Sequence, residues 1–222
     1  MICLTDIKDY EKKVESDDIF DQIEYFYKSK LSSFFNVIIY LLSSVPMQVA
    51  YFFDKKLEKK IDNLLRNNDY VAVMPHLIRV AKNVKRTKVP VLLEMTDSIA
   101  MNYSKFRNFK MAFSGLKNII FALDAGKTKK YEAKCIKNYD HTFLISDIDK
   151  SFILNSCQEL KSKITVSANG CDFNNKIIPA WKDNTQNTII FMGFIKSRQN
   201  FDAALFFIKN VMPIFTKKNY NF

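Results

Sequence analysis

Glycine is scarce in this sequence, which holds four: Gly115, Gly126, Gly170 and Gly193. A Walker A loop and a G-x-G-x-x-G fingerprint both need clustered glycines, because there the backbone approaches a phosphate closely. The scarcity therefore excludes both motifs. It also argues against a nucleotide-dependent oxidoreductase or a methyltransferase, since the first turn of their Rossmann-like domain is rich in glycine. Any phosphate group must be held in another way.

Metal-ligand and disulfide patterns are lacking as well. The four cysteines show no C-x-x-C spacing, and the two histidines, His76 and His141, do not stand at a zinc-like interval from them. We therefore expect no metal and no cofactor. Free thiols are typical of a reducing compartment, and charged residues recur from Asp6 onward, which is unlike a signal peptide. We predict a cytoplasmic location.

One long segment lacks charge. Residues 31–53 contain no charged side chain, and on length alone this run could span a bilayer. Asn36, Pro46 and Gln48 interrupt it. We interpret it as a buried or interfacial helix at 34–42, a turn at 43–46 and a second helix. This interpretation is compatible with peripheral contact at the inner face of a membrane but not with a span.

Positive charge is plentiful, with a net charge of +11 at neutral pH. A basic surface can meet nucleic acid, anionic lipid or a phosphorylated substrate. The lysines are scattered, and the densest set, at 55–60, fits the solvated face of a helix. No common nucleic-acid-binding motif is present. We expect no nucleic-acid partner.

Strand-like and helical patterns alternate along the chain, which predicts an α/β protein with a parallel sheet. The predicted strands are 2–5, 23–27, 70–74, 91–95, 142–145, 164–166 and 188–192. The main predicted helices are 8–14, 57–65, 77–84, 121–138, 148–160 and 201–211, the last closed by Pro213. A Pro-, Asn- and Asp-containing patch predicts a linker at 174–187 between a domain at 1–173 and the beginning of a second at 188–222.

Polar side chains stand where three of the predicted strands end. The apolar run before one of them, Val89 to Leu93, predicts a strand buried on both faces. Ligands of open parallel sheets bind beyond the carboxyl ends of the strands. Ser and Asp are also favoured N-caps, and a histidine there is equally explained by backbone hydrogen bonds, so both interpretations stay open. The polar residues are His76 after 70–74, Glu94, Thr96, Asp97 and Ser98 at the end of 91–95, and Ser146 and Asp147 after 142–145, with Asp149 as a helix N-terminal charge.

Four pieces of the chain together resemble one family. They are LLEMTDSIAMNY, YEAKCIKNYDHTFLISDIDK, NGCD and IIFMGFIKSRQNFDAALFFIKNVMPIF. In order and spacing they resemble the GT-B glycosyltransferases of family 4, especially the sugar transferases of exopolysaccharide gene clusters. Those carry D-S at a strand end, then Y-E, S-x-x-D, N-G-V-D, and F-x-G with an Asn-Asp-Ala run. The segments VPMQVAYFF and MPHLIRVA also fit their acceptor domain, so the resemblance covers nearly the whole chain.

The resemblance implies two Rossmann-like domains, the first for an acceptor and the second for a nucleotide-sugar donor. It implies a hexosyltransferase that moves sugar to a glycan or lipid-linked acceptor in surface polysaccharide synthesis. Family members need no metal, because helix N-termini and basic side chains balance the charge on the leaving diphosphate.

The resemblance also implies roles for individual residues on the acceptor side. Asp97 takes the place of a catalytic cleft residue near the acceptor. Thr96 falls where many relatives carry a histidine. The other implied acceptor-side residues are His76, Ser98, Ser146 and Asp147.

On the donor side, Gly193 matches the glycine that lets a loop approach the donor closely. Phe194 replaces the arginine that commonly follows this glycine in the family. Lys196 and Arg198 are then the candidates to neutralise the diphosphate, although a solvated loop explains them equally well.

Relatives also carry segments that this sequence lacks. They begin with a strand and a glycine-bearing loop ahead of the position of Ile2, and their donor domain continues beyond that of Phe222. We therefore expect a truncated transferase that is inactive by itself, with the crossing between domains at Asn169 and Gly170. The alternative is a non-catalytic remnant, or a module that binds glycan or a membrane surface and keeps the acceptor fold.

Overall fold

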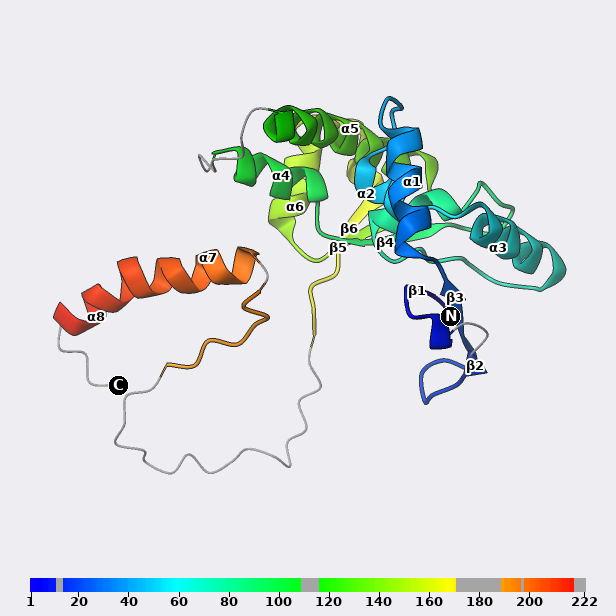
Figure 1. Ribbon diagram of the computed structural model, residues 1–222, viewed down its shortest axis with the longest axis horizontal. Coiled ribbons are helices and arrows are strands. Elements are labelled where there is room, and N and C mark those ends of the chain that lie inside the picture. The colour runs from blue at the N-terminus through cyan, green and yellow to red at the C-terminus, as the bar shows by residue number, and fades with distance from the viewer. Residues whose placement is uncertain (11–13, 109–115, 171–188, 197, 218–222) are drawn as a thin grey trace. The chain divides into compact units, whose positions relative to one another are not determined.

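The computed structural model describes residues 1–10, 14–108, 116–170, 189–196 and 198–217 (Figure 1). The chain divides into two compact units, residues 1–170 and 171–222. The predicted linker at 174–187 lies outside the described residues. Each unit is described by itself.

The first unit begins with a small sheet of order β1-β3-β2. Strand β1 (Ile2–Thr5) runs parallel to β3 (Ile23–Tyr27), and β2 (Val14–Glu15) pairs antiparallel with β3. The strands predicted at 2–5 and 23–27 are confirmed. Of the helix predicted at 8–14, residues 11–13 lie outside the described residues. The prediction is wrong for the rest, because residues 8–10 form a 3-10 turn, η1 (Lys8–Tyr10), and Val14 begins β2, whose pairing with β3 competes with helix formation.

Three helices follow: α1 (Lys30–Tyr40), α2 (Met47–Phe52) and α3 (Lys55–Asn67). Side-chain caps set the starts of α1 and α3, because the Ser29 hydroxyl accepts from the Ser32 amide at 3.2 Å and the Asp54 carboxylate accepts from the Lys56 amide at 2.7 Å. The predicted helix, turn and second helix in 31–53 are confirmed. No helix within the described residues is both long and apolar enough to cross a membrane.

A second sheet has the order β4-β5-β6, with all strands parallel. Its strands are β4 (Leu92–Thr96), β5 (His141–Leu144) and β6 (Ile164–Val166). Helices α4 (Ile99–Asn108) and α5 (Leu116–Asn138) connect β4 to β5, whereas α6 (Asp147–Leu154) and the 3-10 helix η3 (Gln158–Lys163) connect β5 to β6. The predicted α/β class with a parallel sheet is confirmed, although the first strands form a separate sheet.

The segment 73–76 lies beside β4 as a partial fourth strand. The Val73 amide donates to Pro90 O at 2.9 Å and the Glu94 amide donates to Pro75 O at 3.1 Å. Two parallel bridges, Val73 with Val91 and His76 with Glu94, replace the continuous strand predicted at 70–74. Pro75 has no amide hydrogen, which interrupts a ladder. The helix predicted at 77–84 is a 3-10 helix, η2 (Ile78–Asn83).

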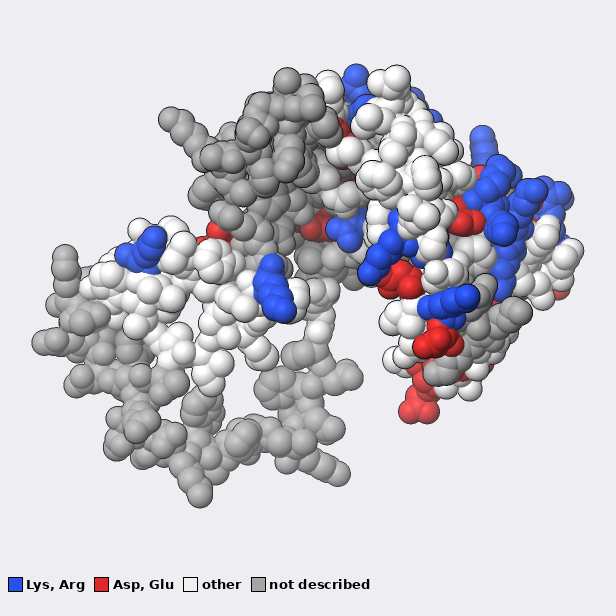
Figure 2. Space-filling view, viewed as in Figure 1, with Lys and Arg blue, Asp and Glu red and all other residues white. Residues whose placement is uncertain are grey.

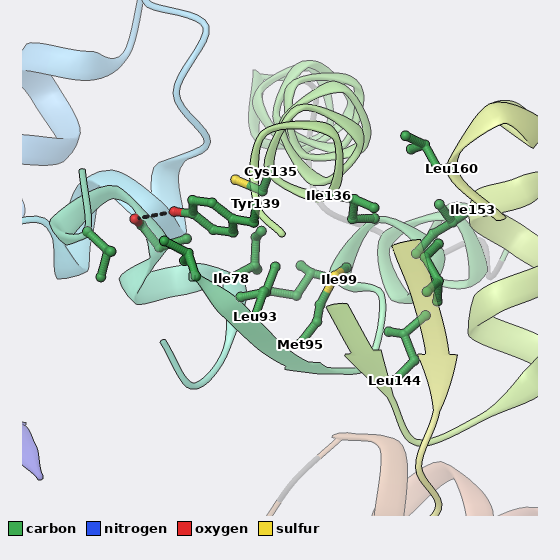
Figure 3. Packing of buried hydrophobic residues seen from close by; sticks show 14 of the residues in the cluster. Ile78, Leu93, Met95, Ile99, Cys135, Ile136, Tyr139, Leu144, Ile153 and Leu160 are labelled. Atoms are coloured by element: carbon green, nitrogen blue, oxygen red, sulfur yellow. Dashed lines mark hydrogen bonds between the residues drawn. The ribbon is translucent and has the colours of Figure 1, made fainter. Parts of the chain in front are cut away.

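The core of the first unit lies between the β4-β5-β6 sheet and the helices on it (Figure 3). Leu93 and Met95 of β4 and Ile136 of α5 are fully buried. The remaining residues of β4 are only half-buried. The prediction of a strand buried on both faces is therefore wrong, because the polar face of β4 carries Glu94 and Thr96.

The second unit contains α7 (Arg198–Phe206), a π-helical turn η4 (Phe207–Val211) and α8 (Met212–Lys217). Pro213 does not close the helix as predicted, because the helical backbone continues from the π-helical turn through Met212 and Pro213 into α8. Residues 189–192 of the strand predicted at 188–192 are not strand. Within the described part of this unit no neighbouring strand offers hydrogen bonds to them, and a lone strand is unstable.

Candidate functional site

Three polar side chains meet at the carboxyl end of segment 73–76 and β4. The Nδ1 atom of His76 forms an ion pair with the Glu94 carboxylate when the imidazole is protonated. The Thr96 hydroxyl donates to the same carboxylate at 2.9 Å. Parallel pairing places His76 opposite Glu94, and the two-residue period of β4 places Thr96 on the same face as Glu94. The imidazole is 72% exposed and the carboxylate 25% exposed, so the cluster is open to solvent.

The backbone around this cluster is strained. Leu77 has φ 69° and Thr96 has φ 64°, and no other non-glycine residue in the described part of the chain has a positive φ. For a β-branched residue such as threonine this conformation costs on the order of 1–3 kcal/mol. The register of β4 against β5 shifts between Glu94 and Thr96, and the Ile145 amide holds the Thr96 carbonyl at 2.9 Å. Strain of this kind gathers at functional sites, where surrounding contacts enforce it.

Asp97 and Ser98 have different roles in the following turn. The Ser98 hydroxyl accepts from the Met101 amide at 3.1 Å and so caps α4. The Asp97 carboxylate accepts instead from the Asn102 side-chain amide at 2.7 Å. Of the two interpretations that the sequence leaves open, the cap therefore applies to Ser98. Asp97 is half-buried and held in one orientation beside the cluster.

Two buried carboxylates accept hydrogen bonds from the turn that begins at Asp97. Asp149 accepts from the Ser98 amide at 2.8 Å, and Glu132 accepts from the Ser98 hydroxyl at 2.8 Å and from the Ala100 amide at 3.0 Å. Ser98 itself is fully buried. It therefore positions the turn rather than lining a cleft. Asp149 is likewise more than the helix N-terminal charge predicted from sequence, because it is buried and contacts Ser98.

Glu132 has a strongly perturbed acidity. Burial raises its pKa to about 7, while hydrogen bonds from Ala100 and Ser98 oppose that rise. The nearby negative charge of Asp97 adds to it. Because burial favours the neutral acid, Glu132 binds or releases a proton near neutral pH, at a position where it contacts Ser98 and Ala100 of the turn.

Ser146 and Asp147 lie at the end of β5 as predicted. The Ser146 hydroxyl accepts from the Ile148 amide at 3.0 Å and caps α6, while Asp147 is exposed in the first turn of that helix. Their contacts are those of a helix N-terminus, where hydroxyls and negative charge are favoured.

The predicted donor-side residues belong to the second unit. A Cβ atom on Gly193 would lie 2.9 Å from Asn200 Nδ2, so glycine permits a close approach there. Lys196 is exposed, and Arg198 is the first residue of α7. At the end of the first unit, Asn169 and Gly170 are exposed, and a Cβ on Gly170 would meet no atom of the described chain within 4 Å. Space therefore does not require glycine at 170.

Sequence reasoning missed several residues of this site. Glu94 stood among the polar residues of its strand but was not predicted to contact His76. Asn102 and Glu132 were not predicted as site residues, although Glu132 belongs to the Y-E pair that the family resemblance uses. Among the residues that the structure describes, no group of three or more His, Cys, Asp or Glu side chains is placed to hold a metal ion.

Comparisons with known proteins do not identify the chain. No protein-family model, no curated protein and no solved structure matches it. The case for a function therefore rests on the sequence motifs and on the geometry of the site.

Proposed function

We propose that this chain forms the acceptor side of a GT-B-type glycosyltransferase. The enzyme would move a hexose from a nucleotide-sugar to a glycan or lipid-linked acceptor in surface polysaccharide synthesis. Besides the sequence resemblance, one observation carries the proposal: an exposed histidine is paired with a carboxylate at the carboxyl edge of a parallel sheet, between two strained residues. That edge is where open α/β sheets bind ligands.

The chemistry of sugar transfer suits this cluster. The acceptor oxygen forms a bond to the anomeric carbon as the bond to the diphosphate breaks, and the acceptor proton must go to a base. His76 would take that proton, because Glu94 orients the imidazole through Nδ1 and stabilises its charged form. Thr96 holds the Glu94 carboxylate in place. Asp97, fixed by Asn102, would bind acceptor hydroxyls.

Donor-dependent transfer tests the proposal. Native protein from its source cells would be assayed with radiolabelled nucleotide-sugars and with glycan and lipid-linked acceptors. The purified chain and the variants named next would be tested for acceptor binding by saturation-transfer NMR. His76→Ala, which removes the base, should lower transfer by at least about 100-fold, and Asp97→Ala should weaken acceptor binding. Asp62→Ala, on the surface of α3, is the matched control. Full transfer by the Asp97 variant would remove Asp97 from the site, and no binding of any acceptor would contradict the acceptor-side assignment.

A second function, binding to a membrane surface without catalysis, is favoured by a different observation. Helix α1 carries an exposed apolar stripe at helical spacing, and Figure 2 shows a continuous white surface over α1 beside the blue lysines over α3. An exposed stripe of this kind on a protein of net charge +11 suits an anionic lipid surface. The stripe consists of Leu31, Phe34, Phe35, Ile38 and Ile39 of α1, and it is continued by Leu42 in the turn after the helix.

A further inference from the structure

A cavity of about 710 Å³ lies at the opposite edge of the β4-β5-β6 sheet, where β4 and β5 begin. Its walls come from the connection between α1 and α2, from the loop 84–91 and from the end of α5 at 134–139. This volume is in the range of small-molecule sites. The cavity is separate from the His76 cluster, which lies at the carboxyl ends of the strands.

The charge around this cavity is strongly one-sided. Its lining contains one carboxylate, that of Asp140, and six basic side chains. The Asp140 carboxylate already accepts a hydrogen bond from the Val91 amide at 2.7 Å. The six are Lys82, Arg86, Lys88, Lys134, Lys137 and Lys163.

Two of these basic groups are engaged in the fold. Lys163 donates to the carbonyls of Lys137 and Tyr139 at 2.7 and 2.8 Å. The Lys82 ammonium lies 4.6 Å from the centre of the Phe53 ring. The other four form no ion pair within the described chain.

A simpler explanation accounts for part of the charge. Lysines near a helix C-terminus favourably compensate its dipole. This explains Lys134 and Lys137 near the end of α5, and Lys163 of η3, which donates to carbonyls at that end. It does not explain Arg86 and Lys88, which lie on the loop after η2 and reach the same cavity.

The lining of the cavity is fixed by the core. The Tyr139 hydroxyl donates to the Ala81 carbonyl at 2.7 Å, drawn as a dashed line in Figure 3. Cys135 and Val91, which also line the cavity, are buried. A floor held in this way needs little ordering when a ligand binds.

We propose that this cavity binds a ligand that carries two or more phosphate groups. Several separated cations around one volume match several phosphates better than a single carboxylate, and arginine pairs with phosphate through two parallel hydrogen bonds. Two sources supply such phosphates, a free polyphosphate compound and a lipid headgroup. The headgroup is included because the connection after the apolar helix α1 forms one wall of the cavity. This site does not depend on the proposed transferase.

Calorimetric titration of the full chain with inorganic pyrophosphate and tripolyphosphate tests the proposal. The variant is Arg86→Gln with Lys88→Gln, and the matched control is Lys8→Gln with Lys130→Gln, which removes the same charge from exposed positions outside the cavity. We expect one saturable site whose affinity falls about tenfold in the cavity variant and remains unchanged in the control.

A second arm separates the two sources of phosphate. Sedimentation with phosphatidylcholine vesicles, with and without phosphatidylglycerol, is measured for the same proteins. If pyrophosphate binds and vesicles do not, the ligand is a free phosphate compound. If the protein binds vesicles, pyrophosphate displaces them and the cavity variant loses this binding, the ligand is a lipid headgroup. Equal losses in the two double variants, or no binding to either probe, would overturn the proposal.

Discussion

At the scale of single residues, Glu132 couples proton binding to folding. Its pKa rises from 4.5 to about 7 on burial, so the folded state binds a proton more tightly than the unfolded state. The stability this contributes is fully present below about pH 4.5 and is lost as the pH rises through about 7. The loss amounts to up to about 3 kcal/mol for a shift of this size.

The first prediction concerns that dependence. The unfolding free energy of the native sequence should fall between pH 5 and pH 8. Glu132→Gln should flatten this fall, because glutamine has the same shape and keeps an acceptor for the Ala100 amide but does not titrate. Urea denaturation followed by circular dichroism at a series of pH values measures it. Glu159→Gln, at an exposed position, should keep the native slope, and a native slope in the Glu132 variant would contradict the coupling.

Strain at Thr96 gives a second residue-scale prediction. Glycine adopts a φ of 64° freely, whereas alanine does not. Both substitutions delete the hydroxyl that contacts Glu94, so their comparison isolates the backbone term. Thr96→Gly should therefore be more stable than Thr96→Ala by about 1 kcal/mol, as measured by denaturant titration. Equal stabilities would show that the backbone relaxes at this position.

At the scale of elements, several strands were predictable and their pairing partners were not. The starts and ends of the strands at 2–5, 23–27 and 164–166 follow from apolar runs bounded by polar residues. Strand β4 was read as buried on both faces because its leucines hide the alternation that Glu94 and Thr96 reveal. The contact of Glu94 with His76 depends on parallel pairing between segments far apart in sequence, which no local pattern encodes.

The predicted strand at 188–192 shows the opposite error. Its apolar residues predict a buried strand. In the structure, however, Ile190 is 83% exposed and Met192 is 92% exposed. A strand needs a neighbour for its backbone hydrogen bonds, and within the described residues of this unit none is present. A local pattern gives the tendency to extend but not the partner.

Helix α1 supports a prediction at the element scale. If its stripe enters the surface of an anionic bilayer, Ile39→Ser with Leu42→Ser should weaken vesicle binding by at least about tenfold, since each buried methylene contributes about 0.8 kcal/mol. Val71→Ser with Ile19→Ser removes similarly exposed apolar groups outside the stripe and serves as the control. Sedimentation with phosphatidylglycerol vesicles measures both. Equal binding by the two variants would exclude α1 as the contact surface.

At the scale of the whole molecule, the two units differ in how much they bury. The hydrophobic cluster lies entirely within residues 61–164 of the first unit. No residue of the second unit whose exposure is described, between 189 and 215, is buried. Cooperative unfolding requires a shared core, so the two units should differ in stability when studied alone.

The last prediction follows from that difference. A chain of residues 1–170 should unfold cooperatively, with a midpoint close to that of the full chain, because the core and the supports of the His76 cluster are all present. A chain of residues 171–222 should show no cooperative transition, since the residues of this unit whose exposure is described include no buried apolar group to offset the conformational entropy of ordering. Thermal melts followed by circular dichroism and calorimetry compare the three chains. If the full chain melted in one transition and the chain of residues 1–170 did not fold, the second unit would be needed to complete the core of the first.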